Sequence, residues 1–150
     1  MNTSALLSRQ GHRLLQLAVA LLLFTSFEGF AIPHVAVPML GRSVHTLSAL
    51  LAVLLLGLGL VWPRLQLGAN TSRIAFWFLI YSGLAIVAAF VLGSLWGAGH
   101  ETMPLAAADA RGSVFEERVI MVVAYSSAPT GIIAFALILW GLRREGRASP

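Results

Sequence analysis

Apolar residues form four long runs along this chain, and polar residues gather between the runs. A helix of about 20 apolar residues crosses the hydrocarbon core of a bilayer, which is about 30 Å thick. The runs span about 14–32, 46–62, 74–96 and 119–142. The pattern therefore predicts an all-α integral membrane protein, a four-transmembrane-helix bundle that forms a single membrane domain over residues 1–150.

Helix-breaking residues separate the four runs. Pro33 and Pro38 follow the first run, Pro63 closes the second, and the glycine-rich stretch 97–112 follows the third. The first run is preceded by arginines, as in a secretory signal, but it carries Glu28 and lacks a small-residue cleavage pattern. We therefore interpret it as a span of the mature protein.

The composition supports a location in the lipid bilayer. Apolar residues make up 58% of the 150 residues and charged residues only 11%, and the mean hydropathy is +0.85, outside the range of soluble domains. The chain has no cysteine, which excludes disulfides, thiolate catalysis and cysteine-ligated metals.

Arginine supplies all ten basic residues, which outnumber six acidic ones. They sit at the ends of the runs rather than along a stripe, so we expect no nucleic-acid partner. In a four-span topology seven arginines lie on one side and three on the other, which predicts that both termini face the cytoplasm. We expect the membrane to be a bacterial-type inner membrane. The seven are Arg9, Arg13, Arg64, Arg73, Arg143, Arg144 and Arg147, and the three are Arg42, Arg111 and Arg118. Trp62, Trp77, Trp96 and Trp140 lie near run ends, as in an interfacial aromatic belt.

Most of the other ionisable groups belong to the opposite end of the predicted bundle, where we expect a site. Side chains close to the interface can reach water and need no function. Glu28 lies about one turn inside the first span, so it should either be protonated or pair with a cation such as Arg42. The groups at this end are Glu28, His34, Arg42, His45, His100 and Glu101.

His45 is the candidate metal ligand. Ser43 is a plausible helix N-cap, which would place His45 in the first turn, where the helix dipole favours a neutral imidazole with a free lone pair. Ser48, Ala49 and Ala52 follow on the same helical face and form a wall of small side chains.

Such a wall has two interpretations. Small residues at helical spacing allow close helix packing in lipid. Alternatively, a flat haem lies against Ser48, Ala49 and Ala52, with His45 as the axial ligand of its iron. A zinc or non-haem iron site using His34 and Glu28 is a weaker alternative, because no His/Glu pair has the i, i+4 spacing.

Hydroxyl groups interrupt the third and fourth runs. Tyr81 and Ser82 lie in "IYSGLAIVAAF", and Tyr125 lies in "AYSSAPTG" beside Pro129. Hydroxyls in membrane helices commonly bond to backbone carbonyls or to a neighbouring helix. The other interpretation makes Tyr81, Ser82 and Tyr125 catalytic residues that line a pocket.

The order of several short motifs resembles a known family. "GH" stands near the start, a histidine opens the second span and a proline closes it in "GLVWPRLQL". "FWFLIYSG", "LWGAG", "MPLA" and "LILWGLR" follow. From about residue 11 to 143 the chain resembles the small four-helix membrane isomerases, which include hydroxylaminobenzene mutases and styrene oxide isomerases, and it is closer to the mutases.

The resemblance implies a cofactor and a reaction. In the isomerase branch the matching histidine, here His45, ligates haem b at the subunit contacts of a homotrimer, and the iron acts as a Lewis acid. In the mutase branch the reaction moves a hydroxyl group from nitrogen to the ortho ring carbon of a small aromatic substrate, as in the conversion of hydroxylaminobenzene to 2-aminophenol.

Three positions depart from the isomerase pattern. The resemblance implies an amide, a carboxylate and a phenol at positions that this chain fills with Leu51, Ser82 and Phe90. The resemblance therefore implies haem binding more strongly than styrene oxide activity. Tyr81, Ser82 and Tyr125 are the candidates to replace the missing hydrogen bonds.

Three functions follow from this reasoning. The first is a haem-dependent membrane isomerase in a homo-oligomer, which can enclose a macrocycle on several sides. The second is a non-catalytic haem-binding or structural membrane subunit that has lost the isomerase residues. The third, a proton or solute pathway built on Glu28, ranks last because four spans are few for a transporter.

Overall fold

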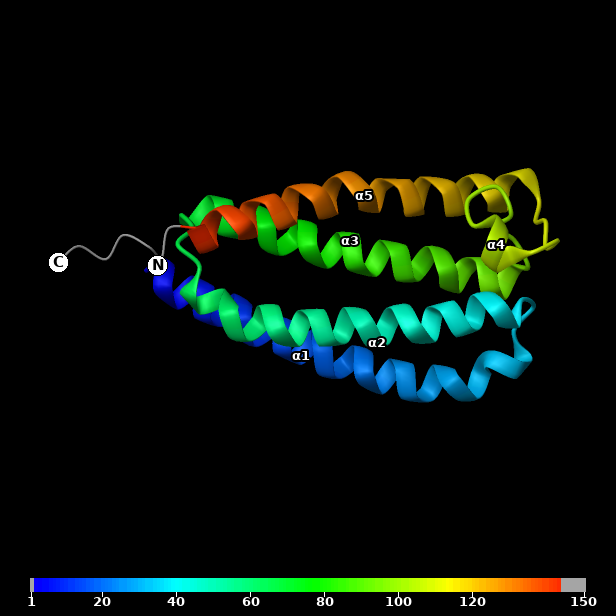
Figure 1. Cartoon of the computed structure of the whole chain (residues 1–150), viewed down its shortest axis with the longest axis horizontal. Coiled ribbons are helices and arrows are strands. Elements are labelled where there is room, and N and C mark those ends of the chain that lie inside the picture. The colour runs from blue at the N-terminus through cyan, green and yellow to red at the C-terminus, as the bar shows by residue number, and fades with distance from the viewer. Residues whose placement is uncertain (1, 144–150) are drawn as a thin grey trace.

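The computed structural model describes residues 2–143 and is built from long helices joined by short connections (Figure 1). The connections contain the 3-10 turns η1 (Ile32–His34) and η2 (Trp62–Arg64) and the one-turn helix α4 (Pro104–Ala107). The long helices are each apolar and long enough to cross a membrane, which confirms the predicted all-α integral membrane protein with four spans. They are α1 (Thr3–Ala31), α2 (Pro38–Val61), α3 (Ala69–Trp96) and α5 (Val114–Arg143).

Each long helix begins before the apolar run that predicted it. At 1.5 Å per residue the 24 to 30 residues of these helices span about 36–45 Å, enough to cross the headgroup regions as well. The first turns of α1, α3 and α5 contain polar residues and therefore contribute little hydropathy. In α1, for example, the side chain of Asn2 caps the helix by accepting a hydrogen bond from the backbone N–H of Ser4 (3.4 Å).

The start of α2 corrects one prediction. The helix begins at Pro38, because proline at the first helical position needs no N–H partner. Ser43 is therefore not the N-cap; its hydroxyl donates to the carbonyl of Met39 (3.2 Å) inside the helix. His45 lies about two turns inside α2, where the helix dipole acts only weakly, so the predicted place of His45 in the first turn was wrong.

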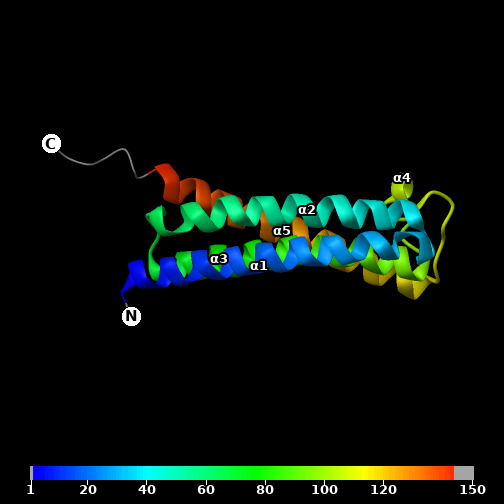
Figure 2. The same cartoon turned by 90° about the horizontal axis from the view of Figure 1, so that it is seen from below.

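The long helices pack as two pairs that share a central contact. α1 packs mainly on α2 and α3 packs mainly on α5, while α2 and α3 join the pairs. All four run along a common long axis (Figure 2). The start of α1 and the end of α5 lie at one end of the bundle, and the connection that contains α4 lies at the other (Figure 1).

The main core lies where both pairs meet. It contains fully buried side chains of α1, α2, α3 and α5, including Leu14, Ala52, Ala75 and Ala134. Many large apolar side chains lie on the outer surface instead; examples are Phe27, Phe30, Val53, Trp77 and Ile132. This distribution suits a bilayer, since lipid chains are as apolar as the core.

Gln10 links three elements through buried polar contacts. Its Oε1 accepts hydrogen bonds from the indole N–H of Trp62 (3.1 Å) and from the hydroxyl of Ser72, and its Nε2 donates to the carbonyl of Ser72 (3.4 Å). Trp62 is completely buried. It was therefore wrongly predicted as a member of the interfacial belt, whereas Trp77, Trp96 and Trp140 are exposed.

We expect Gln10→Leu to lower the free energy of unfolding by about 2 kcal/mol. Leucine fills a similar volume but leaves the buried indole N–H of Trp62 without an acceptor, and a buried unpaired donor costs about 1–3 kcal/mol. Unfolding in detergent, followed by helical circular dichroism, measures the change. Gln16→Leu is the control, since Gln16 is exposed on the same helix. Equal stability of the two variants would contradict the role of Gln10.

The backbones of α1 and α2 approach closely at Gly11 and Gly59. A Cβ atom on Gly11 would lie 2.7 Å from the carbonyl oxygen of Gly59, and one on Gly59 would lie 2.9 Å from the side chain of Leu15. Such approaches require glycine, because no side chain fits between the two backbones.

Candidate functional site

His45 faces Glu28 across the contact between α2 and α1. Its Nδ1 lies 3.3 Å from Oε2 of the Glu28 carboxylate. The imidazole also packs on Gly29, where a Cβ atom would lie in ordinary contact, 3.4 Å from both Nδ1 and Cε1. Glu28 thus faces His45, and within the described residues it forms no ion pair with Arg42.

The two facing atoms are buried, although the histidine side chain as a whole is partly exposed. Both Nδ1 of His45 and Oε2 of Glu28 are inaccessible to solvent and have no hydrogen-bond partner of good geometry. The His45 side chain is 45% exposed and that of Glu28 11%. Nε2, the other ring nitrogen of His45, is not among the buried polar atoms that lack a partner within the described residues.

The three residues of the predicted wall of small side chains differ in their burial. Ser48 and Ala52 are fully buried within the chain, while Ala49 is partly exposed. The buried hydroxyl of Ser48 has no hydrogen-bond partner. The role of Ser48, Ala49 and Ala52 in holding a haem stays a prediction.

The candidate catalytic hydroxyls of α3 contact α5. The hydroxyl groups of Tyr81 and Ser126 are hydrogen-bonded at 2.7 Å, and the hydroxyl of Ser82 donates to the carbonyl of Ser127 at 2.7 Å. Gly131 makes room for Ser82, since a Cβ atom at Gly131 would lie 2.6 Å from Oγ of Ser82. These bonds tie α3 to α5.

Tyr125 does not join these hydroxyls. It precedes Ser126 on α5, but its side chain is 61% exposed. Pro129 lies inside α5 and has no N–H to bond the carbonyl of Tyr125. The structure therefore brings Tyr81 and Ser82 to the same helix contact and leaves Tyr125 on the surface.

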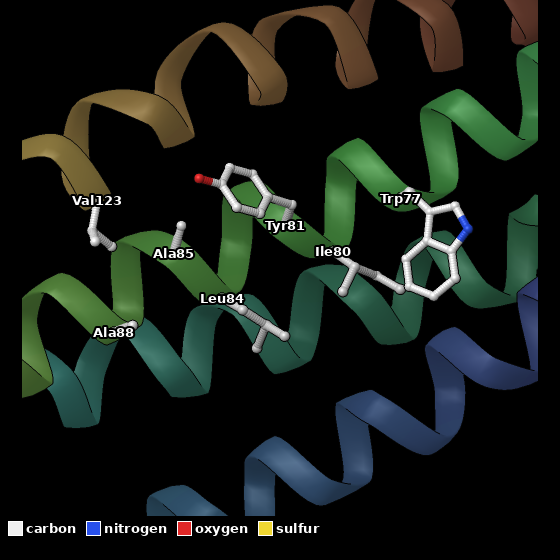
Figure 3. Close-up of a pocket in the computed structure, with 7 residues that line it drawn as sticks. All are labelled: Trp77, Ile80, Tyr81, Leu84, Ala85, Ala88 and Val123. Carbon is white, nitrogen blue, oxygen red and sulfur yellow. The ribbon is translucent and has the colours of Figure 1, made fainter.

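Tyr81 lines an apolar cleft of about 440 Å³ on α3, here called the outer cleft (Figure 3). An adjoining cleft of about 450 Å³ between α1 and α3 shares Leu84 and Ala88 with it. A volume of this size accommodates a small aromatic molecule. The outer cleft is lined by Trp77, Ile80, Tyr81, Leu84, Ala85, Ala88 and Val123.

Two further cavities lie between α2 and α3, here called the α2–α3 groove. One, of about 250 Å³, is lined by Leu51, Ser82 and Gly83, among others, and the other, of about 350 Å³, by Arg42 and Phe90. Both are lined by Leu47. His45 lines neither this groove nor the outer cleft.

The connection between α3 and α5 is organised by Glu117, which sequence reasoning missed. Its buried carboxylate accepts hydrogen bonds from the backbone N–H groups of Gly99 (2.9 Å), His100 (3.3 Å), Gly112 (3.1 Å) and Glu101 (3.2 Å). A glutamate beside a glycine-rich loop is the only sequence signal of this role.

His100 belongs to the same connection and not to the His45 contact. Its Nδ1 donates to the carbonyl of Ala108 (2.6 Å), and its Nε2 accepts from Arg111 (3.3 Å). His34 is exposed at η1. Within residues 2–143 no three His, Cys, Asp or Glu side chains lie close enough to hold a metal ion, so the zinc or non-haem iron alternative lacks a ligand set in one protomer.

Comparison with known proteins identifies the family of this chain. Residues 10–143 match the styrene oxide isomerase family. The chain belongs to the styrene oxide isomerase family. It is 40% identical to hydroxylaminobenzene mutase HabB of Ectopseudomonas oleovorans over 95% of this chain and 85% of that protein. It is 32% identical to hydroxylaminobenzene mutase HabA of the same organism, over 84% of this chain and 93% of that protein. No solved structure matches the chain significantly.

Membership in the styrene oxide isomerase family confirms the resemblance and makes the protein an isomerase of the membrane. It also favours the enzymatic interpretation over a non-catalytic subunit and over a transport pathway. All three positions that depart from the isomerase pattern, Leu51, Ser82 and Phe90, line the α2–α3 groove. This member of the family therefore has a largely apolar groove at those positions.

Proposed function

We propose that this isomerase is a haem b-dependent mutase that converts a small aryl hydroxylamine, of the hydroxylaminobenzene type, into the corresponding 2-aminophenol. The observation that carries the proposal is the 40% identity to a hydroxylaminobenzene mutase over 95% of the chain. The apolar outer cleft beside Tyr81 suits a small aromatic ring.

The residues at His45 fit an axially ligated haem. A haem iron needs a neutral imidazole nitrogen that is directed outward. Nδ1 of His45 is buried against Glu28, whereas Nε2 is not among the buried atoms without a partner and the side chain is 45% exposed. Ala49 follows one turn later on the same face. When bound, the haem iron supplies a Lewis acid for a substrate oxygen.

The position of His45 supports assembly into a homo-oligomer. The imidazole lines neither the outer cleft nor the α2–α3 groove of its own protomer. A site that uses His45 together with Tyr81 or Ser82 therefore needs neighbouring copies, and a closed ring of copies supplies them. We propose a homotrimer, the number that the family resemblance implies.

The side chains around the substrate have separate roles in this proposal. The apolar walls of the outer cleft hold the aromatic ring, and the hydroxyl of Tyr81, held by Ser126, orients the hydroxylamine by hydrogen bonding. Ser82 presents a hydroxyl to the α2–α3 groove. Tyr125 lies on the surface and acts only where a neighbouring copy covers it.

The reaction is balanced without a second substrate. The N–O bond breaks and a C–O bond forms at the ortho carbon. The ortho carbon loses its hydrogen as a proton, and the nitrogen gains one. No oxidant or reductant is consumed, so the apolar surroundings serve to exclude water from the electron-poor ring.

The proposed orientation follows the arginine distribution. The start of α1 and the end of α5 lie at the same end of the bundle (Figure 1), and Arg9, Arg13, Arg64 and Arg73 belong to that end. We propose that this end faces the cytoplasm of a bacterial-type inner membrane.

We expect the protein purified in detergent to show a Soret band and to convert phenylhydroxylamine into 2-aminophenol without added cofactor. Liquid chromatography measures the product, and a reaction in ¹⁸O-labelled water tests whether the oxygen moves within the molecule. Unlabelled 2-aminophenol in equimolar yield supports the proposal. No product, or product labelled from water, overturns the intramolecular mutase reaction, and a spectrum without a Soret band overturns the haem.

A further inference from the structure

We propose that Glu28 is a positioning residue for His45: its carboxylate holds the imidazole with the proton on Nδ1 and the Nε2 lone pair directed at the haem iron. The inference rests on the proposed function and extends it to a residue outside the substrate clefts. It is carried by the facing arrangement of the two side chains between α1 and α2.

The surroundings leave Glu28 with His45 as its partner. Oε2 of Glu28 is buried and has no hydrogen-bond partner within the described residues, and Nδ1 of His45, 3.3 Å away, is in the same condition. An unpaired polar atom is costly at this depth in the membrane. Two such atoms that face each other are satisfied together when a proton lies on Nδ1.

A second observation concerns the direction of the ring. The Cε1 and Nδ1 edge of the imidazole faces Gly29, the neighbour of Glu28 on α1, at van der Waals distance. Nδ1 is buried in this contact, whereas Nε2 is not among the buried atoms without a partner, and the side chain as a whole is 45% exposed. With Nδ1 turned to the carboxylate, Nε2 is the ring nitrogen that remains for a ligand.

The chemistry of metal-bound histidine explains the use of such a pair. A ligating histidine commonly donates its other N–H to a carboxylate, which fixes the tautomer and makes the ligand more basic. A more basic ligand stabilises the ferric state over the ferrous state. Glu28 is thereby expected to strengthen haem binding and to lower the reduction potential of the iron.

A purely structural ion pair between α1 and α2 is the competing explanation. Such a pair would change the stability of the protein with or without haem. It would not change the strength of the iron–histidine bond. The decisive measurements are therefore properties of the bound haem rather than turnover.

The experiment compares Glu28→Gln and Glu28→Ala with the full-length wild type in detergent. Glutamine keeps an acceptor for Nδ1–H but removes the charge, whereas alanine removes both. We expect Glu28→Ala to bind haem about 10- to 100-fold more weakly, and Glu28→Gln to keep a stoichiometric Soret band at raised haem concentration. Both variants should shift the reduction potential upward and the ferrous iron–histidine stretching frequency downward, with the larger shifts in Glu28→Ala.

Glu101→Gln is the matched control, because Glu101 is an exposed carboxylate at the same end of the bundle. It should leave haem affinity, potential and stretching frequency unchanged. Wild-type values of potential and stretching frequency in Glu28→Gln and Glu28→Ala overturn the proposal even if their thermal stability falls. If His45→Ala loses haem while the two Glu28 variants keep wild-type values, only the role of Glu28 is refuted. If His45→Ala retains haem, or if the wild type binds none, both the role of Glu28 and the haem proposal are refuted.

Discussion

Replacing His45 with alanine should abolish the Soret band and reduce mutase turnover about 100- to 1000-fold. The His45 side chain is 45% exposed although its Nδ1 is buried against Glu28, and alanine removes the proposed iron ligand. Lewis-acid polarisation contributes several kcal/mol to lowering a barrier, and each 1.36 kcal/mol corresponds to a factor of ten in rate. The absorption spectrum and the rate of 2-aminophenol formation measure the two effects.

His34→Ala is the control for this experiment. His34 lies at the same end of the bundle as His45, in η1, but its side chain is exposed. We expect its Soret band and its turnover to match the wild type. If His34→Ala loses haem while His45→Ala retains it, the ligand assignment is wrong.

Addition of imidazole to His45→Ala separates a missing ligand from a collapsed structure. Free imidazole can occupy the space that the side chain leaves and restore a ligand to the iron. Partial return of the Soret band and of turnover would locate the defect at the ligand. Wild-type turnover of His45→Ala without imidazole would contradict the proposed mechanism.

Gly11→Val should lower the free energy of unfolding by about 3 kcal/mol. A Cβ atom at Gly11 lies 2.7 Å from the carbonyl oxygen of Gly59, so α1 and α2 must move apart to accommodate it. Overpacking of this kind typically costs about 1–3 kcal/mol. A backbone oxygen can move aside less than a flexible side chain, so we expect a loss at the upper end of this range. Thermal unfolding in detergent measures the loss.

The control is Gly57→Val, a substitution on α2 close to Gly59. A Cβ atom at Gly57 has no other heavy atom within 4 Å, and the residue is exposed. Valine is the better helix former there, so the stability should stay the same or rise by a few tenths of a kcal/mol. Equal destabilisation of both variants would show that valine itself, and not the close approach, is responsible.

The same displacement of α1 from α2 in Gly11→Val would weaken haem binding only slightly. Glu28 lies on α1 and His45 on α2, so the contact depends on the spacing of the two helices. Gly11 is far along α1 from Glu28, and any effect on haem is therefore expected to be smaller than that of Glu28→Ala.

The apolar side chains of the α2–α3 groove bear on which reaction this isomerase catalyses. Leu51 and Phe90 are apolar where the family resemblance implies an amide and a phenol. An apolar groove offers few groups that activate a strained epoxide by proton transfer. A hydroxylamine carries its own labile N–O bond, which is consistent with a mutase rather than an epoxide isomerase.

Hydropathy identified the four spans because it is a local property. Each span is apolar on nearly every side, so no partner is needed to recognise it. The starts of the helices were harder to predict. Polar residues in the first turns of α1, α3 and α5 lower the local hydropathy, and Pro38 begins α2 five residues before the expected cap at Ser43.

The candidate site was found only in part from the sequence. Glu28 was recognised because an ionisable group inside an apolar run is costly, and His45 because it stands at the start of a run and is followed by small residues on the same helical face. Their pairing was not predicted, since Arg42 carries the stronger charge and lies nearby in the chain. Glu117 and the contacts of Gln10 escaped notice because their partners are backbone groups or residues more than 50 positions away.

The amino-acid sequence by itself determined the membrane location, the number of spans and the resemblance to membrane isomerases, since these depend on composition and on the order of short motifs. Only the tertiary structure decided which polar groups meet. In the structure His45 faces Glu28, and the buried Trp62 donates a hydrogen bond to Gln10. Tyr81 and Ser82 lie at the contact between α3 and α5, and Tyr125 does not. The physical reason is that an almost uniformly apolar helix carries little record of which side faces a neighbour, so that close packing of backbones, and not hydropathy, selects the contacts.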